Sequence, residues 1–285
     1  MKKALIPTVI FTILAVLTAG FRIYQSVYMI DSKTGFFFEE YANIESIYLI
    51  GIFGLIIAYF IIAMFTIKFQ NLRNCQIKSK PLGILTLILM AFSVAQTVNY
   101  CSIISTDNIP SVVMTVIFIA QSLFLLYFGI CLSTGKKPVA EIFLIPSIFA
   151  GVRFAVTFIC YVDVIKVSDI ILTITMLGFA MLFWHSFARV NSGLATKGTI
   201  KLMFASGFPA ALLSLTCAVP KFFVLLFNIE SGIHISEHVS VFDIASGIYI
   251  AVFLIMMLSA KIKVDERVVL AEKLQEENEN GTVQP

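Results

Sequence analysis

The sequence predicts an all-α integral membrane protein with eight transmembrane helices, and two observations carry this prediction. The first is composition: 59% of the 285 residues are hydrophobic and 13% are charged, whereas a soluble domain is about 45–50% apolar and about 25% charged. The second is spacing, because the apolar residues gather into eight segments, and a helix needs about 20 such residues to cross a bilayer. We therefore expect the lipid bilayer to be the main surrounding of the chain.

Short polar connections separate the eight segments. The segments are residues 4–29, 47–68, 82–105, 111–132, 139–162, 168–190, 199–227 and 240–260. The first could instead be a cleaved signal peptide, which would leave seven spans, but its apolar run is longer than such a peptide carries. Proline with glycine or asparagine at 81–83, 108–110 and 135–138 precedes the third, fourth and fifth segments. These residues break helices, so we expect the chain to turn there.

The distribution of basic residues predicts the orientation. All but five of the 20 lysines and arginines fall at the membrane side that holds the N-terminus. The exceptions are Arg22, Lys33, Arg153, Lys166 and Lys221. Because basic loops stay in the cytoplasm, we expect a multi-pass protein of the cell membrane with both termini in the cytoplasm. The composition also lacks the strong basic stripe of a nucleic-acid-binding protein, so no nucleic-acid partner is expected.

A short pattern occurs twice and suggests an internal duplication. An Ala-Gly-x-Arg sequence followed by tyrosine and aspartate occupies residues 19–31 and again residues 150–163. Each copy opens a block of four segments, which predicts a parallel four-plus-four repeat. The predicted halves are residues 1–132 and 133–263, followed by a cytoplasmic amphipathic or disordered tail at 264–285. The other segments show no convincing identity.

Five residues form the candidate substrate-binding site. Arg22, Arg153, Lys221 and Asp243 fall inside segments at similar predicted depth, near the outer side, where buried charges are costly and normally face a bundle interior or a wet cavity. A guanidinium fork suits a carboxylate or a phosphate. Two such forks would grip a small anionic ligand in an outward-facing pocket, and Gln25, one turn beyond Arg22, would add a donor.

The alternative interpretation is structural. Each arginine would pair with a nearby acid, such as Asp31, Asp163 or Asp243, and lock helices together. Polar residues of the third and fourth segments are open to the same two interpretations. Ser93, Gln121 and their neighbours either line a cavity or join helices by hydrogen bonds, and we favour the second.

The loop at residues 234–238 reads HISEH, a spacing that some zinc metalloproteases use. The chain has no large extramembrane region to supply a third ligand and a substrate cleft. We therefore expect a solvated loop, with no metal, no cofactor and no enzymatic activity. A P-loop and a GxSxG motif are also absent from the sequence.

Arg22 followed by Asp31-Ser32-Lys33-Thr34-Gly35-Phe36-Phe37 resembles uncharacterised multi-pass membrane proteins of low-GC Gram-positive bacteria. These proteins often have an arginine and then a D-x-x-T-G turn after the first span. The resemblance covers about 20 residues. It implies a bacterial cell membrane location and no particular activity.

The sequence favours a small-solute transporter, or the membrane subunit of one, because a duplication and buried charges at matched depth suit a binding site between two halves. The other class is a non-transporting sensor or assembly partner with structural arginines. Apolar residues of the tail recur at helical spacing, at Val264, Val268, Ala271 and Leu274, and would serve a protein contact.

Overall fold

The computed structural model describes residues 2–30, 37–66, 79–103, 109–136, 138–160, 167–194, 196–229 and 240–259. The helices are α1 (Lys2–Tyr28), α2 (Ala42–Thr66), α3 (Lys80–Ile103), α4 (Ile109–Thr134), α5 (Leu144–Cys160), α6 (Val167–Asn191), α7 (Lys197–Phe227) and α8 (Val241–Ser259). Short 3₁₀ turns precede α2 (Glu39–Tyr41) and α5 (Ala140–Phe143). Eight helices of the described part are long and apolar enough to span a membrane, which confirms the predicted all-α, multi-pass architecture.

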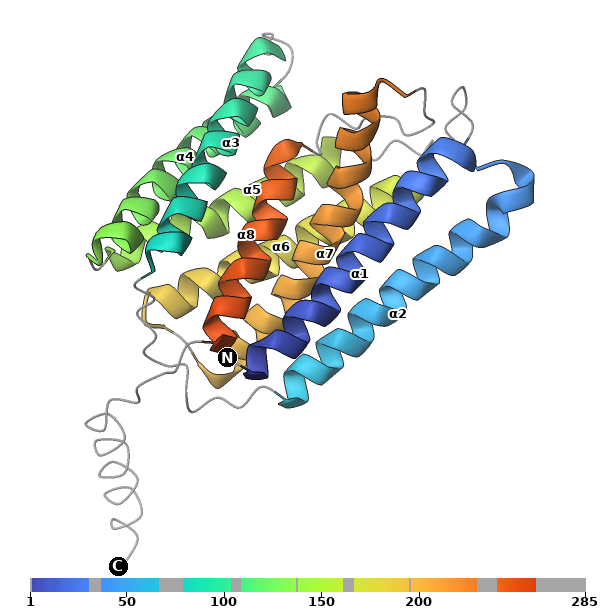
Figure 1. Cartoon of the computed structure of the whole chain (residues 1–285). Helices are drawn as coiled ribbons and strands as arrows, with labels where there is room; N and C mark the ends of the chain where they lie inside the picture. The colour runs from blue at the N-terminus through green and yellow to red at the C-terminus, as the bar shows by residue number, and fades with distance from the viewer. Residues whose placement is uncertain are drawn as a thin grey trace, which may run out of the picture.

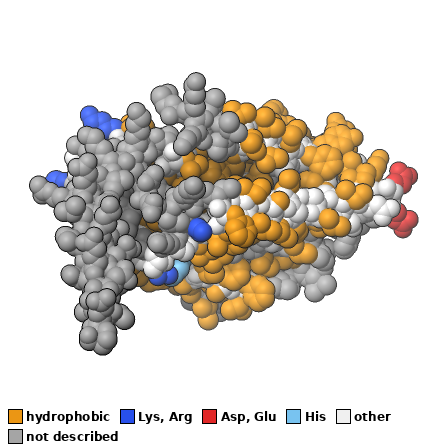
Figure 2. Space-filling model, turned by 90° about the horizontal axis from the view of Figure 1, so that it is seen from below, with side chains coloured by type: hydrophobic (Ala, Val, Ile, Leu, Met, Phe, Trp, Pro, Cys, Tyr) orange, Lys and Arg blue, Asp and Glu red, His pale blue; other side chains and the backbone are white. Residues whose placement is uncertain are grey.

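The helices form one bundle in which neighbours along the chain run in opposite directions (Figure 1). We call the end where α1, α3, α5 and α7 finish the upper end, as drawn in Figure 1, and the opposite end the lower end. The α3–α4 hairpin lies at one side and α1 and α2 lie at the other, with α5 to α8 between and behind them. Hydrophobic side chains cover most of the described surface seen from below, and acidic side chains lie at one edge of that view (Figure 2).

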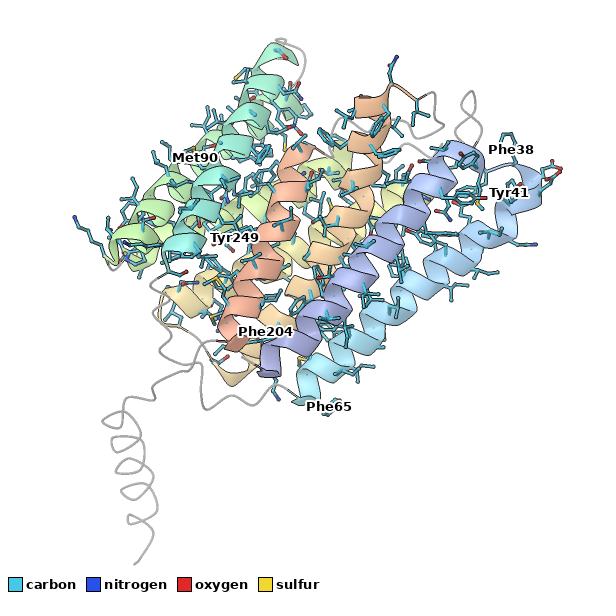
Figure 3. The ribbon with its side chains drawn as sticks, viewed as in Figure 1. Phe38, Tyr41, Phe65, Met90, Phe204 and Tyr249 are labelled. Atoms are coloured by element: carbon cyan, nitrogen blue, oxygen red, sulfur yellow. The ribbon has the colours of Figure 1, made fainter. Side chains whose placement is uncertain are left out.

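α7 is the central helix, because it packs against α1, α2, α6 and α8. Its first turn is fixed by a capping box between Thr196 and Thr199, and its last turn ends at Asn228, which has a left-handed backbone (φ 49°). Large side chains fill the space around it, so that Phe204 of α7 and Tyr249 of α8 are fully buried (Figure 3). The remaining spans are positioned around this helix.

Glycine lets α6, α7 and α8 approach closely. A Cβ atom on Gly207 of α7 would lie 2.6 Å from Leu254 Cδ1 of α8 and 2.8 Å from Phe183 Cδ2 of α6. A Cβ atom on Gly247 of α8 would lie 2.9 Å from Ser214 Cβ of α7. Small residues allow such backbone contact between membrane helices, where dispersion replaces the hydrophobic effect as the driving force.

The predicted division into two halves stays a prediction. α1 packs against α7 and α8, α2 packs against α7, and α3 packs against α8, so the proposed halves contact each other extensively. α5 packs along α6, whereas α1 and α2 approach each other mainly where Tyr48 of α2 contacts α1. The packing of the described helices therefore leaves the four-plus-four repeat unconfirmed.

Candidate functional site

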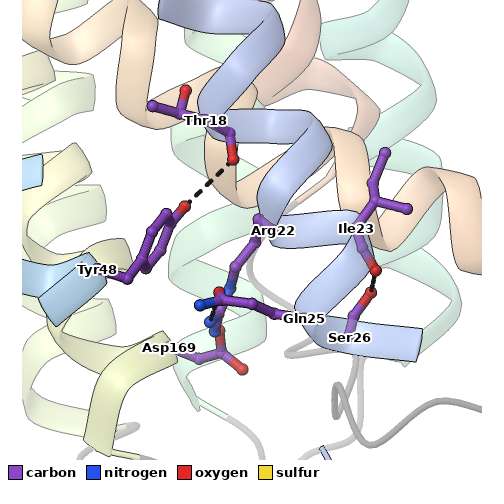
Figure 4. Close-up of polar contacts among 7 residues, drawn as sticks. All are labelled: Thr18, Arg22, Ile23, Gln25, Ser26, Tyr48 and Asp169. Atoms are coloured by element: carbon purple, nitrogen blue, oxygen red, sulfur yellow. Dashed lines mark hydrogen bonds and ion pairs between the residues drawn. The ribbon is translucent and has the colours of Figure 1, made fainter. Parts of the chain in front are cut away.

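Two ion pairs that join helices lie in the upper half of the bundle. The first joins Arg22 of α1 to Asp169, which lies in the first turn of α6 (Figure 4). Arg22 also donates from Nη1 to Gln25 Oε1 at 3.0 Å. The ring of Tyr48 lies 5.9 Å from the guanidinium carbon, and its hydroxyl donates to the carbonyl oxygen of Thr18 at 3.3 Å. This arrangement ties α1 to both α2 and α6.

The second ion pair is bidentate and more deeply buried. Arg153 of α5 donates from Nη1 and Nη2 to the two carboxylate oxygens of Asp243 of α8, at 2.7 and 2.8 Å. The two side chains are 5% and 3% exposed. Rings of Phe118 and Phe242 lie 5.7 and 5.6 Å from the guanidinium carbon. Parallel hydrogen bonds of this kind combine geometric specificity with strong charge-assisted bonding.

Asp243 also organises the beginning of α8. The backbone N–H of Ser240 donates to Asp243 Oδ2 at 2.9 Å, and the N–H of Asp243 donates to the carbonyl oxygen of Ser240. A side chain in the first turn that bonds back to the preceding backbone is half of a capping box. The carboxylate therefore faces Arg153 from a position fixed by the start of its own helix.

Lys221 of α7 is also buried in this part of the bundle. It lies within electrostatic reach of both Asp169 and Asp243. All five residues of the predicted site are therefore buried in the upper half of the bundle. They are not gathered into one pocket: Gln25 contacts Arg22, and each arginine contacts its own carboxylate.

The acid that binds Arg22 was not among the predicted partners. Asp243 was proposed as a partner and is found on Arg153, whereas Arg22 contacts Asp169. The other two proposed acids, Asp31 and Asp163, lie outside the described residues. Asp169 could have been recognised from its place in the first turn of the sixth segment, at the same membrane side as Arg22.

A small cavity lies below the Arg153–Asp243 pair, between α5, α6, α7 and α8. Its volume of about 10 Å³ is close to that of one water molecule. Hydroxyl-bearing Ser214 and Ser246 line it, together with Trp184 and the ion pair itself. At about 1.5 Å per residue, these residues lie roughly 3 to 25 Å from the upper ends of their helices, with Asp243 nearest and Trp184 farthest. The cavity is therefore near mid-depth in the bundle.

Aromatic side chains close the bundle below the cavity. Trp184 lies 5.2 Å from Phe187 between ring centroids, and Phe187 lies 5.7 Å from Phe128 and 5.1 Å from Phe253. Most of these contacts are edge-to-face, the arrangement that aromatic pairs favour. Four transmembrane segments thus converge on a densely packed lower half, because Phe143 from the turn before α5 also contacts Phe187.

Polar side chains of α3 and α4 join these two helices, as the favoured interpretation predicts for Ser93. Ser122 Oγ lies 2.8 Å from Ser93 Oγ and donates to the carbonyl oxygen of Phe118 at 2.7 Å. Gln121 differs, because its side chain is fully buried and neither amide atom has a hydrogen-bond partner among the described residues.

A hydroxyl and an imidazole also meet at the surface between α5 and α6. Ser147 Oγ lies 3.2 Å from His185 Nδ1. Within the described ranges no carboxylate hydrogen bond to this imidazole is found, so the contact lacks the group that would orient a catalytic base. The contact of Ser147 with His185 therefore joins two helices.

The described residues also contain no cluster of three or more metal-ligating side chains, while the HISEH loop and the tail lie outside them.

Comparison with family models, with curated proteins and with solved structures found no match to this chain. The site must therefore be interpreted from its own geometry. It combines a buried ion pair, a small cavity with hydroxyl groups and an aromatic closure.

Proposed function

We propose that the protein is a small-solute transporter, or the membrane subunit of one, in an occluded conformation. The observation that carries this proposal is the position of the cavity: it lies near mid-depth, with the Arg153–Asp243 pair above it and the Trp184–Phe187 ring contacts below it. Transporters commonly hold solutes near the bilayer midplane and close access from either side in turn. We further propose a cell membrane location with the upper end outside.

In this proposal the two ion pairs have different roles. Arg153 and Asp243 close the path above the cavity and would bind the solute when they separate, whereas the pair of Arg22 and Asp169 clamps α1 to α6. Both pairs bridge helices that are far apart in the sequence, so breaking either would free relative movement at the upper end. The tight contact of α6, α7 and α8 at Gly207 is a suitable pivot.

The test uses a reporter that the chain already contains. Trp184 is the single tryptophan of the sequence and lines the cavity. Solutes that reach the site should change its fluorescence in the detergent-purified full chain, and should be taken up by vesicles that contain the protein. Ser246→Val, which places methyl groups in the cavity wall, should abolish both effects. Ser147→Ala, remote from the cavity lining, should leave both unchanged. If no solute changes the fluorescence and none is taken up, the proposal fails.

The second candidate is a non-transporting sensor or assembly partner, and a specific observation favours it. Both arginines have carboxylate partners on other helices, and the cavity admits about one water molecule. Buried pairs that only hold helices together would give the same geometry. In that case Ser246→Val would fill the cavity and stabilise the protein without affecting the binding of a partner protein. Affinity capture of the full chain would be the next experiment.

A further inference from the structure

The ion pair of Arg153 and Asp243 forms one part of the cavity wall, and its two opposite charges restrict which solutes can bind there. Arg153 and Asp243 neutralise each other through two hydrogen bonds of 2.7 and 2.8 Å in a site that excludes water almost completely. A solute with a single charge would take one partner and leave the other buried without the two hydrogen bonds that now pair it, which is strongly unfavourable. A neutral solute would have no means of separating them.

A solute with both charges avoids this cost. Its carboxylate can occupy the guanidinium fork of Arg153 while its ammonium group binds the carboxylate of Asp243, so one buried ion pair is replaced by two. Because the pair is in direct contact, the two charges of the solute must be close together, as they are when one carbon atom carries both.

The remaining walls limit the size and suit the charge. Ser214 and Ser246 offer hydroxyl groups, and the ring of Phe242 already lies 5.6 Å from a cationic carbon. Aromatic faces attract ammonium groups as they attract guanidinium. The present volume of about 10 Å³ holds about one water molecule, so only a small solute, admitted when the pair separates and the surrounding helices move apart, fits there.

We propose that the cavity beneath Arg153 and Asp243 binds small zwitterions with adjacent ammonium and carboxylate groups, of the size of a short α-amino acid. This inference rests on the transport function proposed above and specifies its substrate class. The site predicted from the sequence already included Asp243 but was assigned an anionic ligand. The ligand inferred here also carries an ammonium group, which Asp243 binds.

The experiment compares alanine with two analogues, each of which lacks one of its charged groups, by Trp184 fluorescence in the full chain. Alanine carries both charges, propionate lacks the ammonium group and ethylamine lacks the carboxylate. We expect alanine to bind at least about 100-fold more tightly than either analogue, as the cost of an unpaired buried charge implies. Equal affinity of propionate and alanine would overturn the inference while leaving the transport proposal standing, because a solute would still reach the cavity. A response to none of the three probes would overturn it as well.

Two variants show whether the preference comes from the pair. Asp243→Asn should reduce the ratio of alanine to propionate affinity to about one, because the ammonium group has lost its partner. The double variant Arg153→Gln/Asp243→Asn removes both charges of the pair. It provides the same comparison if the single variant, which leaves Arg153 without its carboxylate, fails to fold. It should lose the preference for alanine over both analogues. A preference that persists in the double variant would place zwitterion binding elsewhere and overturn the assignment.

Discussion

The Arg153–Asp243 pair gives the most direct test of the reasoning about buried charge. Arg153→Met or Asp243→Leu alone leaves one charge in a site where both side chains are at most 5% exposed. Each single change should lower the free energy of unfolding by about 3–5 kcal/mol. The double variant removes both charges of the pair and fills similar volume, and it also loses the hydrogen bond to the Ser240 backbone, about 1 kcal/mol. We expect the double variant to lie within about 2 kcal/mol of the parent.

The coupling free energy follows from these values and is at least about 4 kcal/mol. It would be measured by unfolding the purified full chain with increasing SDS in mixed micelles and following helix content by circular dichroism. If the double variant loses as much stability as the two single variants together, the residues act independently. The structural argument, and the substrate class derived from the same pair, would then both be wrong.

Three further changes have defined outcomes in the same assay. Asp169→Asn should cost less than Asp243→Leu, roughly 1–3 kcal/mol, because the Asp169 side chain is 25% exposed; an equal cost would contradict this. Gly207→Ala places a Cβ atom 2.6 Å from a side chain of α8 and should cost about 1–3 kcal/mol. Gly54→Ala is its control, since that Cβ atom meets nothing within 4 Å, and it should change stability by about 0.5 kcal/mol or less. Gln121→Leu removes a buried amide without partners among the described residues and should stabilise the protein by about 1–3 kcal/mol; a loss of stability would mean that the amide has a partner after all.

The spans could be predicted from the sequence because each depends on local composition. The eight helices begin and end within a few residues of the apolar segments, and polar connections separate them. The partner of Arg22 could not be predicted in the same way. Sequence proximity suggested Asp31, but the neighbour of α1 at this depth is the start of α6, which brings Asp169. Choosing between these acids requires knowing which helices are adjacent.

The cavity was also beyond prediction from the sequence. Ser214, Ser246 and Trp184 come from three different helices, and each has the local pattern of an ordinary core position. A cavity is a property of how well several helices fit together, so no single segment carries its signal. The sequence did indicate the charges above it, because ionisable residues in an apolar segment are conspicuous.

The same packing that shapes the cavity also indicates where it could widen. Gly247 brings α8 so close to Ser214 that α7 and α8 have little freedom to separate beside the cavity. The opposite walls belong to α5 and α6, and the Arg153–Asp243 pair joins α5 to α8 beside a ring contact of Phe149 with Phe242. A solute that replaces this pair with its own charges would remove the ionic restraint on α5 at the moment of binding. Recognition of a zwitterion and release of the upper closure would then be one event, since both act on the same two side chains.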